Sequence, residues 1–186
     1  MTFDEIFSAF HARIRRYVAR LVGDADADDV AQVTFAKVHQ ALPHFRHQAA
    51  VSTWVYRIAT NAAFDHARKN AGPAAVTEPL DDDAIAEPAQ TPEEAAARHE
   101  MSACVAAYVD QLPLAWRTVL VLSEHEGLTN QEIADALGTT LDNVKIRLHR
   151  ARRRLKADLE QGCRVYRDER DVLTCEPKPQ PVSFRR

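Results

Sequence analysis

Residues 129–159 carry the pattern that most restricts the fold of this chain. Thr129 precedes Glu132 by three residues, the spacing of a reciprocal helix cap, so a short helix is predicted to begin directly after Thr129. Gly138 predicts the turn that ends this helix, and Thr140 is predicted to cap a second, longer one. The apolar residues of the second helix recur at helical spacing: Val144, Leu148, Ala151, Leu155 and Leu159. Two capped helices joined by a glycine turn predict a helix-turn-helix unit.

Earlier segments also have the 3.6-residue period of amphipathic helices. The first runs over residues 3–21 and is stopped by Gly23, and the second covers about residues 26–42. Ser52 is predicted to cap a third helix, which has these inward-facing residues: Trp54, Val55, Ile58, Ala59 and Ala62. Because the chain has only 5 glycines and no alternating β-branched runs, we expect an all-α protein.

An acidic segment without helical period separates the two helical groups. Residues 70–93 contain several prolines and almost no large apolar side chains, so burial there cannot offset the entropy of ordering. We therefore predict two small helical domains, 1–69 and 94–161, joined by a flexible acidic linker. The second domain contains the helix-turn-helix, and residues 162–186 are predicted to form an irregular tail.

Basic residues are concentrated on the second helix of the predicted helix-turn-helix, although the whole chain has a net charge of -3. No acid interrupts the segment 145–156. A helix fits the major groove, where each base pair presents its own pattern of donors and acceptors, so the segment predicts DNA binding. Lys145 and His149 are predicted to reach base edges, whereas three arginines are better placed for phosphates: Arg147, Arg150 and Arg153.

The third predicted helix has a polar face preceded by an aromatic and amide-rich loop. Arg57, Asn61 and Asp65 are spaced by four residues and therefore lie on one helix face. The loop 45–51 comes just before them. Amides can recognise base edges, arginines can hold phosphates, and aromatic groups can receive an unstacked base. Taken alone, such a face is more often simply solvated.

Acidic and amide residues cluster near the start of the second predicted helix. Asp28, Asp29 and Gln32 precede Phe35. Acids near a helix N-terminus complement the helix dipole, which needs no partner. The alternative interpretation is an exposed face that docks onto another protein.

In this order, the three segments resemble the extracytoplasmic-function (ECF) sigma factors of the sigma-70 family of bacterial RNA polymerase. The likeness covers roughly residues 3–69 and 94–160. It rests on these blocks: 28–32 with Phe35, 45–59 with Asn61 and Asp65, and 131–134 with 144–152.

The resemblance implies an alternative sigma factor that joins core RNA polymerase, recognises promoter DNA and promotes strand opening, in a stress or metal response. It implies core-polymerase-binding residues Asp28, Asp29, Gln32 and Phe35. It implies -10 element residues Phe45, Arg46, Arg57, Ile58, Asn61, Asp65 and Arg68. It implies -35 element residues Thr140, Asn143, Lys145, Arg147, His149, Arg150 and Arg153. An anti-sigma factor is a further expected partner.

The cysteines do not predict a cofactor. Cys104, Cys163 and Cys175 are odd in number and lack metal-ligand spacing, so no metal site is predicted and reduced thiols in the cytoplasm are expected. Cys104 is expected to pack in the core. The resemblance allows Cys163 and Cys175 to act as regulatory thiols that sense metal or redox state.

Two other classes of function compete with this interpretation. A helix-turn-helix regulator that binds duplex DNA as a dimer without polymerase is the alternative, although no dimerising heptads are present. An enzyme is not expected, because the 8 histidines have no ligand spacing and no nucleophile motif occurs. The apolar runs are too short to insert into a membrane.

Overall fold

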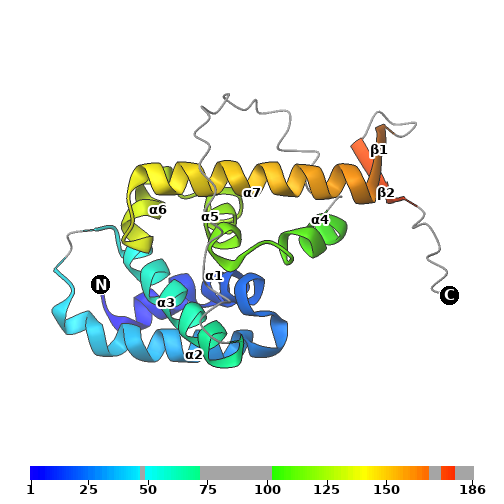
Figure 1. The fold of residues 1–186 in the computed structure, drawn as a ribbon. Coiled ribbons are helices and arrows are strands. Elements are labelled where there is room, and N and C mark those ends of the chain that lie inside the picture. The colour runs from blue at the N-terminus through cyan, green and yellow to red at the C-terminus, as the bar shows by residue number, and fades with distance from the viewer. Residues whose placement is uncertain (47–48, 72–101, 168–172, 179–186) are drawn as a thin grey trace.

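The computed structural model describes residues 1–46, 49–71, 102–167 and 173–178, which form two groups of helices and a terminal hairpin (Figure 1). The first group contains α1 (Phe3–Val22), α2 (Asp24–Ala41), the short 3-10 helix η1 (Leu42–His44) and α3 (Val51–Ala71). The second contains α4 (Ser102–Val109), α5 (Leu114–Glu124), α6 (Asn130–Leu137) and α7 (Leu141–Gly162). The predicted helical fold class is confirmed.

The helix-turn-helix forms as its caps predict. The Thr129 hydroxyl accepts a hydrogen bond from the Glu132 amide at 3.3 Å, and the Glu132 carboxylate accepts from the Thr129 amide at 2.8 Å. Gly138 ends α6 with a φ of 64°, a left-handed conformation that glycine adopts without steric cost. The Thr140 hydroxyl then caps α7 by accepting from the Asn143 amide at 3.2 Å.

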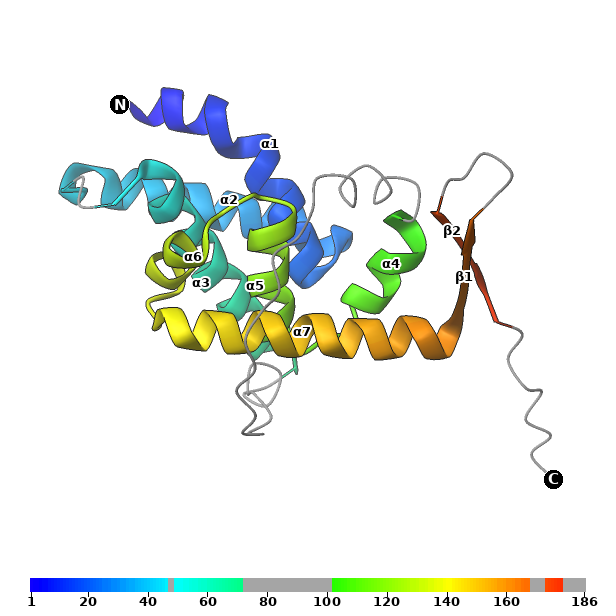
Figure 2. The ribbon, with the colours of Figure 1, turned by 90° about the horizontal axis from the view of Figure 1, so that it is seen from above.

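The two helical groups pack against each other rather than standing apart. Helix α3 lies beside α6, and α1 lies beside α5, in both views of the ribbon (Figures 1 and 2). The buried apolar residues of both groups form one continuous cluster, which includes Tyr56 of α3 and Ile133 of α6. Helix α7 extends past this cluster, and its far end carries the hairpin. No helix within the described ranges has the length and apolar character needed to span a bilayer.

Two predictions of local structure were wrong. The third helix begins at Val51, before Ser52, because the Trp54 amide already donates to the Ala50 carbonyl at 3.0 Å. The tail is not irregular throughout: β1 (Cys163–Arg167) and β2 (Leu173–Pro177) form an antiparallel hairpin. The predicted flexible linker lies almost wholly outside the described residues.

A buried tyrosine stabilises the first group. The Tyr17 and Thr60 hydroxyls are 2.6 Å apart, and the Tyr17 side chain is fully buried. Burial raises the pKa of Tyr17, so the neutral form is favoured in the folded chain. Unfolded tyrosine ionises near pH 10, and Tyr17 therefore contributes stability below about pH 10 that is lost as the pH rises through its folded pKa.

We expect Tyr17→Phe to lower the free energy of unfolding by about 1–2 kcal/mol, because Thr60 loses a buried hydrogen-bond partner. Thermal unfolding followed by circular dichroism at pH 7 measures this change. Tyr166→Phe is the matched control, because Tyr166 is 40% exposed on β1. Equal melting temperatures for the two variants would contradict the prediction.

Candidate polymerase and promoter interfaces

The predicted -35 residues share one helix and its cap, but they differ in exposure. Four side chains are exposed: Thr140, Asn143, Lys145 and Arg153. Arg147 and Arg150 are half-buried. The structure therefore brings this set together along the first half of α7, with the apolar residues Val144, Leu148 and Ala151 buried on the opposite side.

His149 differs from the rest of this set. Its Nε2 atom is buried and has no hydrogen-bond partner among the described residues. Contact with a base edge through this atom would require the ring to turn. Its role in base recognition stays a prediction.

The predicted -10 residues lie on α3 and in the segment before it. The Phe45 ring stacks on Trp54 with centroids 4.5 Å apart, while Arg46 is exposed. On α3, Asn61 and Arg68 are exposed and Ile58 is half-buried. Residues 47–48 of the predicted base-binding loop lie outside the described residues.

The side chains of Asp65 and Arg57 both have hydrogen-bond partners within the chain. The Asp65 carboxylate accepts hydrogen bonds from Arg68 and from Lys37 Nζ at 3.3 Å, and these contacts, Arg68 first, lower its pKa. Arg57 of α3 donates to the Asp135 and Ala136 carbonyls at the end of α6, in the other helical group. Asp65 therefore holds the cations beside it, whereas the Arg57 guanidinium is bound to carbonyls of the second helical group.

The predicted docking residues of α2 border a groove of about 700 Å³ between α1 and α2. Asp28, Asp29 and Gln32 are exposed, whereas Phe35 is only 4% exposed. Phe35 lies beneath Phe7, with ring centroids 4.9 Å apart. Phe35 thus forms the floor of the groove, and Phe7, at 39% exposed, is its accessible aromatic side chain.

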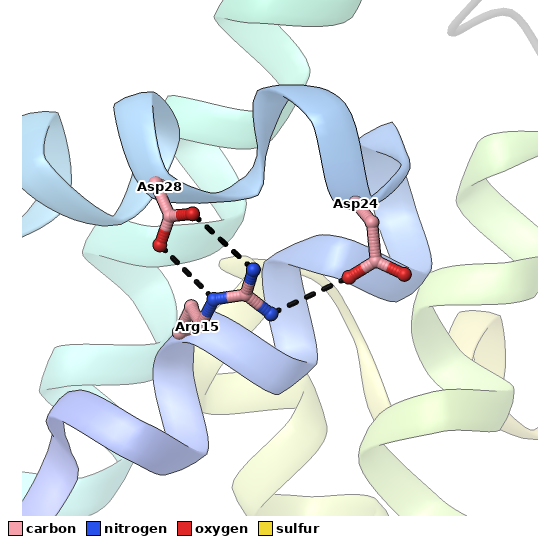
Figure 3. Close-up of polar contacts among 3 residues, drawn as sticks. All are labelled: Arg15, Asp24 and Asp28. Atoms are coloured by element: carbon pink, nitrogen blue, oxygen red, sulfur yellow. Dashed lines mark hydrogen bonds and ion pairs between the residues drawn. The ribbon is translucent and has the colours of Figure 1, made fainter.

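Arg15 of α1 fixes the position of the Asp28 carboxylate, one of the predicted docking residues (Figure 3). Its Nε and second terminal nitrogen bind the two oxygens of Asp28 at 3.0 and 3.2 Å, and its other terminal nitrogen lies 3.4 Å from Asp24 Oδ1. This paired hydrogen bonding with Arg15 lowers the pKa of Asp28. The Asp28 carboxylate is therefore ionised and held at the rim of the groove.

Comparisons with known proteins agree with this geometry. Residues 6–72 match the family model of sigma-70 region 2, and residues 102–155 match that of sigma-70 region 4. The chain is 36% identical over 171 residues to the RNA polymerase sigma-H factor of Pseudomonas aeruginosa, an alignment that covers 85% of this chain and 86% of that one. The chain is an ECF sigma factor of the sigma-70 family.

Other relatives of this sigma factor support the same assignment. It is 32% identical to the ECF RNA polymerase sigma factor SigW of Bacillus subtilis, over 84% of this chain and 88% of SigW. CnrH, solved in complex with the cytosolic domain of CnrY, superposes with a TM-score of 0.61 at 26% identity, over 86% of this chain and 88% of CnrH. The sigma factor RpoE of Bartonella quintana, solved with the anti-sigma factor NepR, has the same fold at 18% identity, with a TM-score of 0.63 over 85% of this chain and 96% of RpoE.

The sigma factor therefore initiates transcription as an alternative sigma subunit, and its partners are core RNA polymerase and promoter DNA. The family consists of transcription factors rather than catalysts.

Sequence reasoning missed one residue beside these surfaces, Arg15, and two residues that join the helical groups, Glu126 and Arg117. Arg15 could have been found, because it faces the acids that follow the Gly23 turn. Glu126 and Arg117 could not, because their partners belong to the other helical group.

Proposed function

We propose that the sigma factor uses three separate surfaces to bind core polymerase, the -10 element and the -35 element. The groove beside Asp28, Asp29, Gln32 and Phe35 docks onto core polymerase. The α3 surface, from Phe45 and Arg46 through Arg57, Ile58, Asn61, Asp65 and Arg68, binds the opened -10 element. The α7 surface, with Thr140, Asn143, Lys145, Arg147, His149, Arg150 and Arg153, binds the -35 element.

The observation that carries this proposal is the capped turn that leads into α7. The cap leaves Asn143 and Lys145 exposed on the first turns of the helix, with Arg153 further along. In helix-turn-helix proteins, residues near the start of the second helix contact base edges, and flanking cations contact phosphates. Capture of an unstacked -10 base by α3 offsets an unstacking cost of a few kcal/mol without any covalent step, so no enzymatic activity is required.

Run-off transcription with purified core polymerase tests the proposal. The sigma factor is expected to co-purify with core and to direct transcripts from a promoter that contains both elements. A chain that binds palindromic duplex DNA as a dimer, and does not join core, would instead be a helix-turn-helix regulator.

We further infer that the sigma factor works in the cytoplasm under the control of an anti-sigma factor, in a stress or metal response. RpoE of Bartonella quintana was solved with the anti-sigma factor NepR, and CnrH was solved with the cytosolic domain of CnrY, which supports this inference. A pull-down from the native host, followed by mass spectrometry, tests it. Recovery of core polymerase alone, from both uninduced and stressed cells, would contradict it.

Cys163 and Cys175 are proposed as regulatory thiols. Cys163 is buried at the start of β1, with its Sγ 3.6 Å from Tyr108 Oη of α4. Cys175 lies on β2 opposite Val165, and Cys163 lies opposite Pro177, two residues further along the same strand. The side chain of Cys175 is outside the described part of the structure. Because the Cys163 thiol contacts Tyr108, a change at this thiol would act directly on the contact between the hairpin and α4.

We expect the double variant Cys163→Ser and Cys175→Ser to lose induction of a reporter promoter by metal or peroxide. Basal run-off transcription is expected to be retained, because neither residue belongs to a proposed polymerase or DNA surface. Unaltered induction in the double variant would end the proposal. Cys104→Ser is the control.

A further inference from the structure

Helix α5 ends on an acid, at the end of a helix that is unfavourable for negative charge. Glu124 is the final residue of α5, and the last turn of this helix contains no basic residue of its own. The last carbonyls of a helix carry partial negative charge, which opposes a carboxylate beside them. A cation from another element therefore stabilises a carboxylate at this position.

Arg152 of α7 supplies such a cation. Its terminal nitrogen donates to Glu124 Oε1 at 2.9 Å, and the side chains of Arg152 and Glu124 are 31% and 24% exposed. Water and salt screen a partly covered pair less than a fully exposed one, so this contact favours one position of α7 on α5. Arg154 and Lys156, by contrast, pair with acids of α7 itself, and those pairs do not join α7 to another helix.

Arg152 shares one flank of α7 with the two residues that were predicted to reach base edges. Lys145, His149 and Arg152 are spaced by four and then three residues, so they lie along one face of the helix. Lys145 is exposed near the start of α7, whereas the Nε2 atom of His149 is buried. The flank therefore runs from an exposed end to an end held on α5, and the Arg152 contact sets the rotation of α7 about its axis.

The Glu124 end of α5 is joined by a closed turn to α6, the first helix of the helix-turn-helix. The Leu128 amide donates to the Leu122 carbonyl at 3.0 Å, and Gly127 turns the chain with a φ of 69°. Thr129 then caps α6. Helix α7 packs on both α5 and α6 (Figures 1 and 2). A contact between α7 and the end of α5 therefore also sets the angle between α6 and α7.

We propose that Arg152 is a positioning residue for recognition of the -35 element, because its pair with Glu124 holds α7 in the orientation that presents Lys145 to base edges. The inference rests on the proposed α7 surface. It gives a separate role to one arginine of the basic segment 145–156, which the charge pattern alone would assign to phosphate binding. In helix-turn-helix proteins the second helix must enter the major groove at a defined angle. Loss of the Arg152 pair therefore lowers specific binding without removing a contact to DNA.

Glu124→Gln is the decisive variant, because the two possible roles of Arg152 predict changes of opposite sign. If Arg152 positions α7, affinity of the holoenzyme for a -35-containing promoter falls about three- to tenfold, although the chain loses a negative charge. Affinity for a promoter with a scrambled -35 element is expected to stay at the wild-type value. If Arg152 binds a phosphate instead, its release from Glu124 raises affinity and steepens the slope of log affinity against log salt by about 0.9. Fluorescence anisotropy with saturating core polymerase measures all three quantities.

A charge swap tests the same role in a variant that keeps an ion pair. Arg152→Glu alone places two carboxylates together and is expected to weaken specific binding more than Glu124→Gln does. Adding Glu124→Arg restores an opposite-charge pair at the original net charge, and specific affinity is expected to return to within about twofold of wild type. Glu160→Gln is the matched control: it makes the same charge change as Glu124→Gln at the exposed end of α7, and it is expected to keep the wild-type affinity.

Two results would overturn the inference. One is a Glu124→Gln chain, folded by circular dichroism, whose holoenzyme binds the -35-containing promoter as tightly as wild type or more tightly. The other is a charge-swapped chain that binds as weakly as Arg152→Glu, and this result decides alone if Glu124→Gln does not fold. A wild-type holoenzyme without preference for the -35 element over the scrambled one would reject the proposed α7 surface itself, and this inference with it. Failure of the inference alone is therefore distinguishable, because wild type then keeps its preference.

Discussion

Replacing Lys145 and Arg153 by alanine is expected to weaken binding of the holoenzyme to a -35-containing promoter by about 30- to 150-fold, because it removes two hydrogen-bonding contacts of about 1–1.5 kcal/mol each. Both side chains are exposed on the α7 surface, where they can bind phosphates or bases. Removing the phosphate contact of Arg153 should also lower the slope of log affinity against log salt by about 0.9. Fluorescence anisotropy at several salt concentrations measures both quantities.

The same helix supplies a matched control for this prediction. Arg154 and Lys156 are also exposed cations of α7, but each is paired within the helix, with Asp158 at 2.9 Å and Glu160 at 3.8 Å. Alanine at both positions makes the same change in net charge and is expected to alter affinity less than threefold. Equal losses for the two double variants would mean that α7 acts only through overall charge, and the proposed -35 surface would be wrong.

The parts of the fold that depend on local chemistry were predictable from the sequence. The Thr129 and Glu132 cap, the left-handed Gly138 and the Thr140 cap each involve residues within a few positions of one another, and all three form as expected. The hairpin was not predicted, because β1 and β2 are short and their pairing is not set by periodicity.

The contacts between the two helical groups could not be predicted from local sequence patterns. Glu126 is 70 residues from Tyr56 along the chain, and Arg57 is 78 residues from Asp135. Nothing in the pattern around Arg57 distinguishes an arginine that binds phosphate from one that caps a helix, since both use the same guanidinium donors. The sequence therefore predicted Arg57 as a candidate for DNA contact, and only the packing of α3 on α6 reveals its present partner.

Charge reversal at Asp28 is expected to have the largest effect on polymerase binding. Asp28→Lys removes the carboxylate that Arg15 holds at the rim of the groove and places two cations side by side. On the proposed docking surface, the lysine also opposes any cation of the polymerase that Asp28 binds. Like charges across an interface cost several kcal/mol, so affinity for core polymerase should fall about 100-fold or more. Titration of labelled sigma factor with core measures this loss.

Asp24→Lys is the control that isolates the docking surface. Asp24 belongs to the same helix and contacts the same Arg15, but it is not among the groove-lining residues. It is expected to change affinity for core less than threefold. Because Arg15 lowers the pKa of Asp28, this carboxylate stays ionised as the pH falls from 8 to 6, and its contribution to core binding should be constant over that range. A similar loss for both variants would show that net charge, rather than the Asp28 position, governs docking.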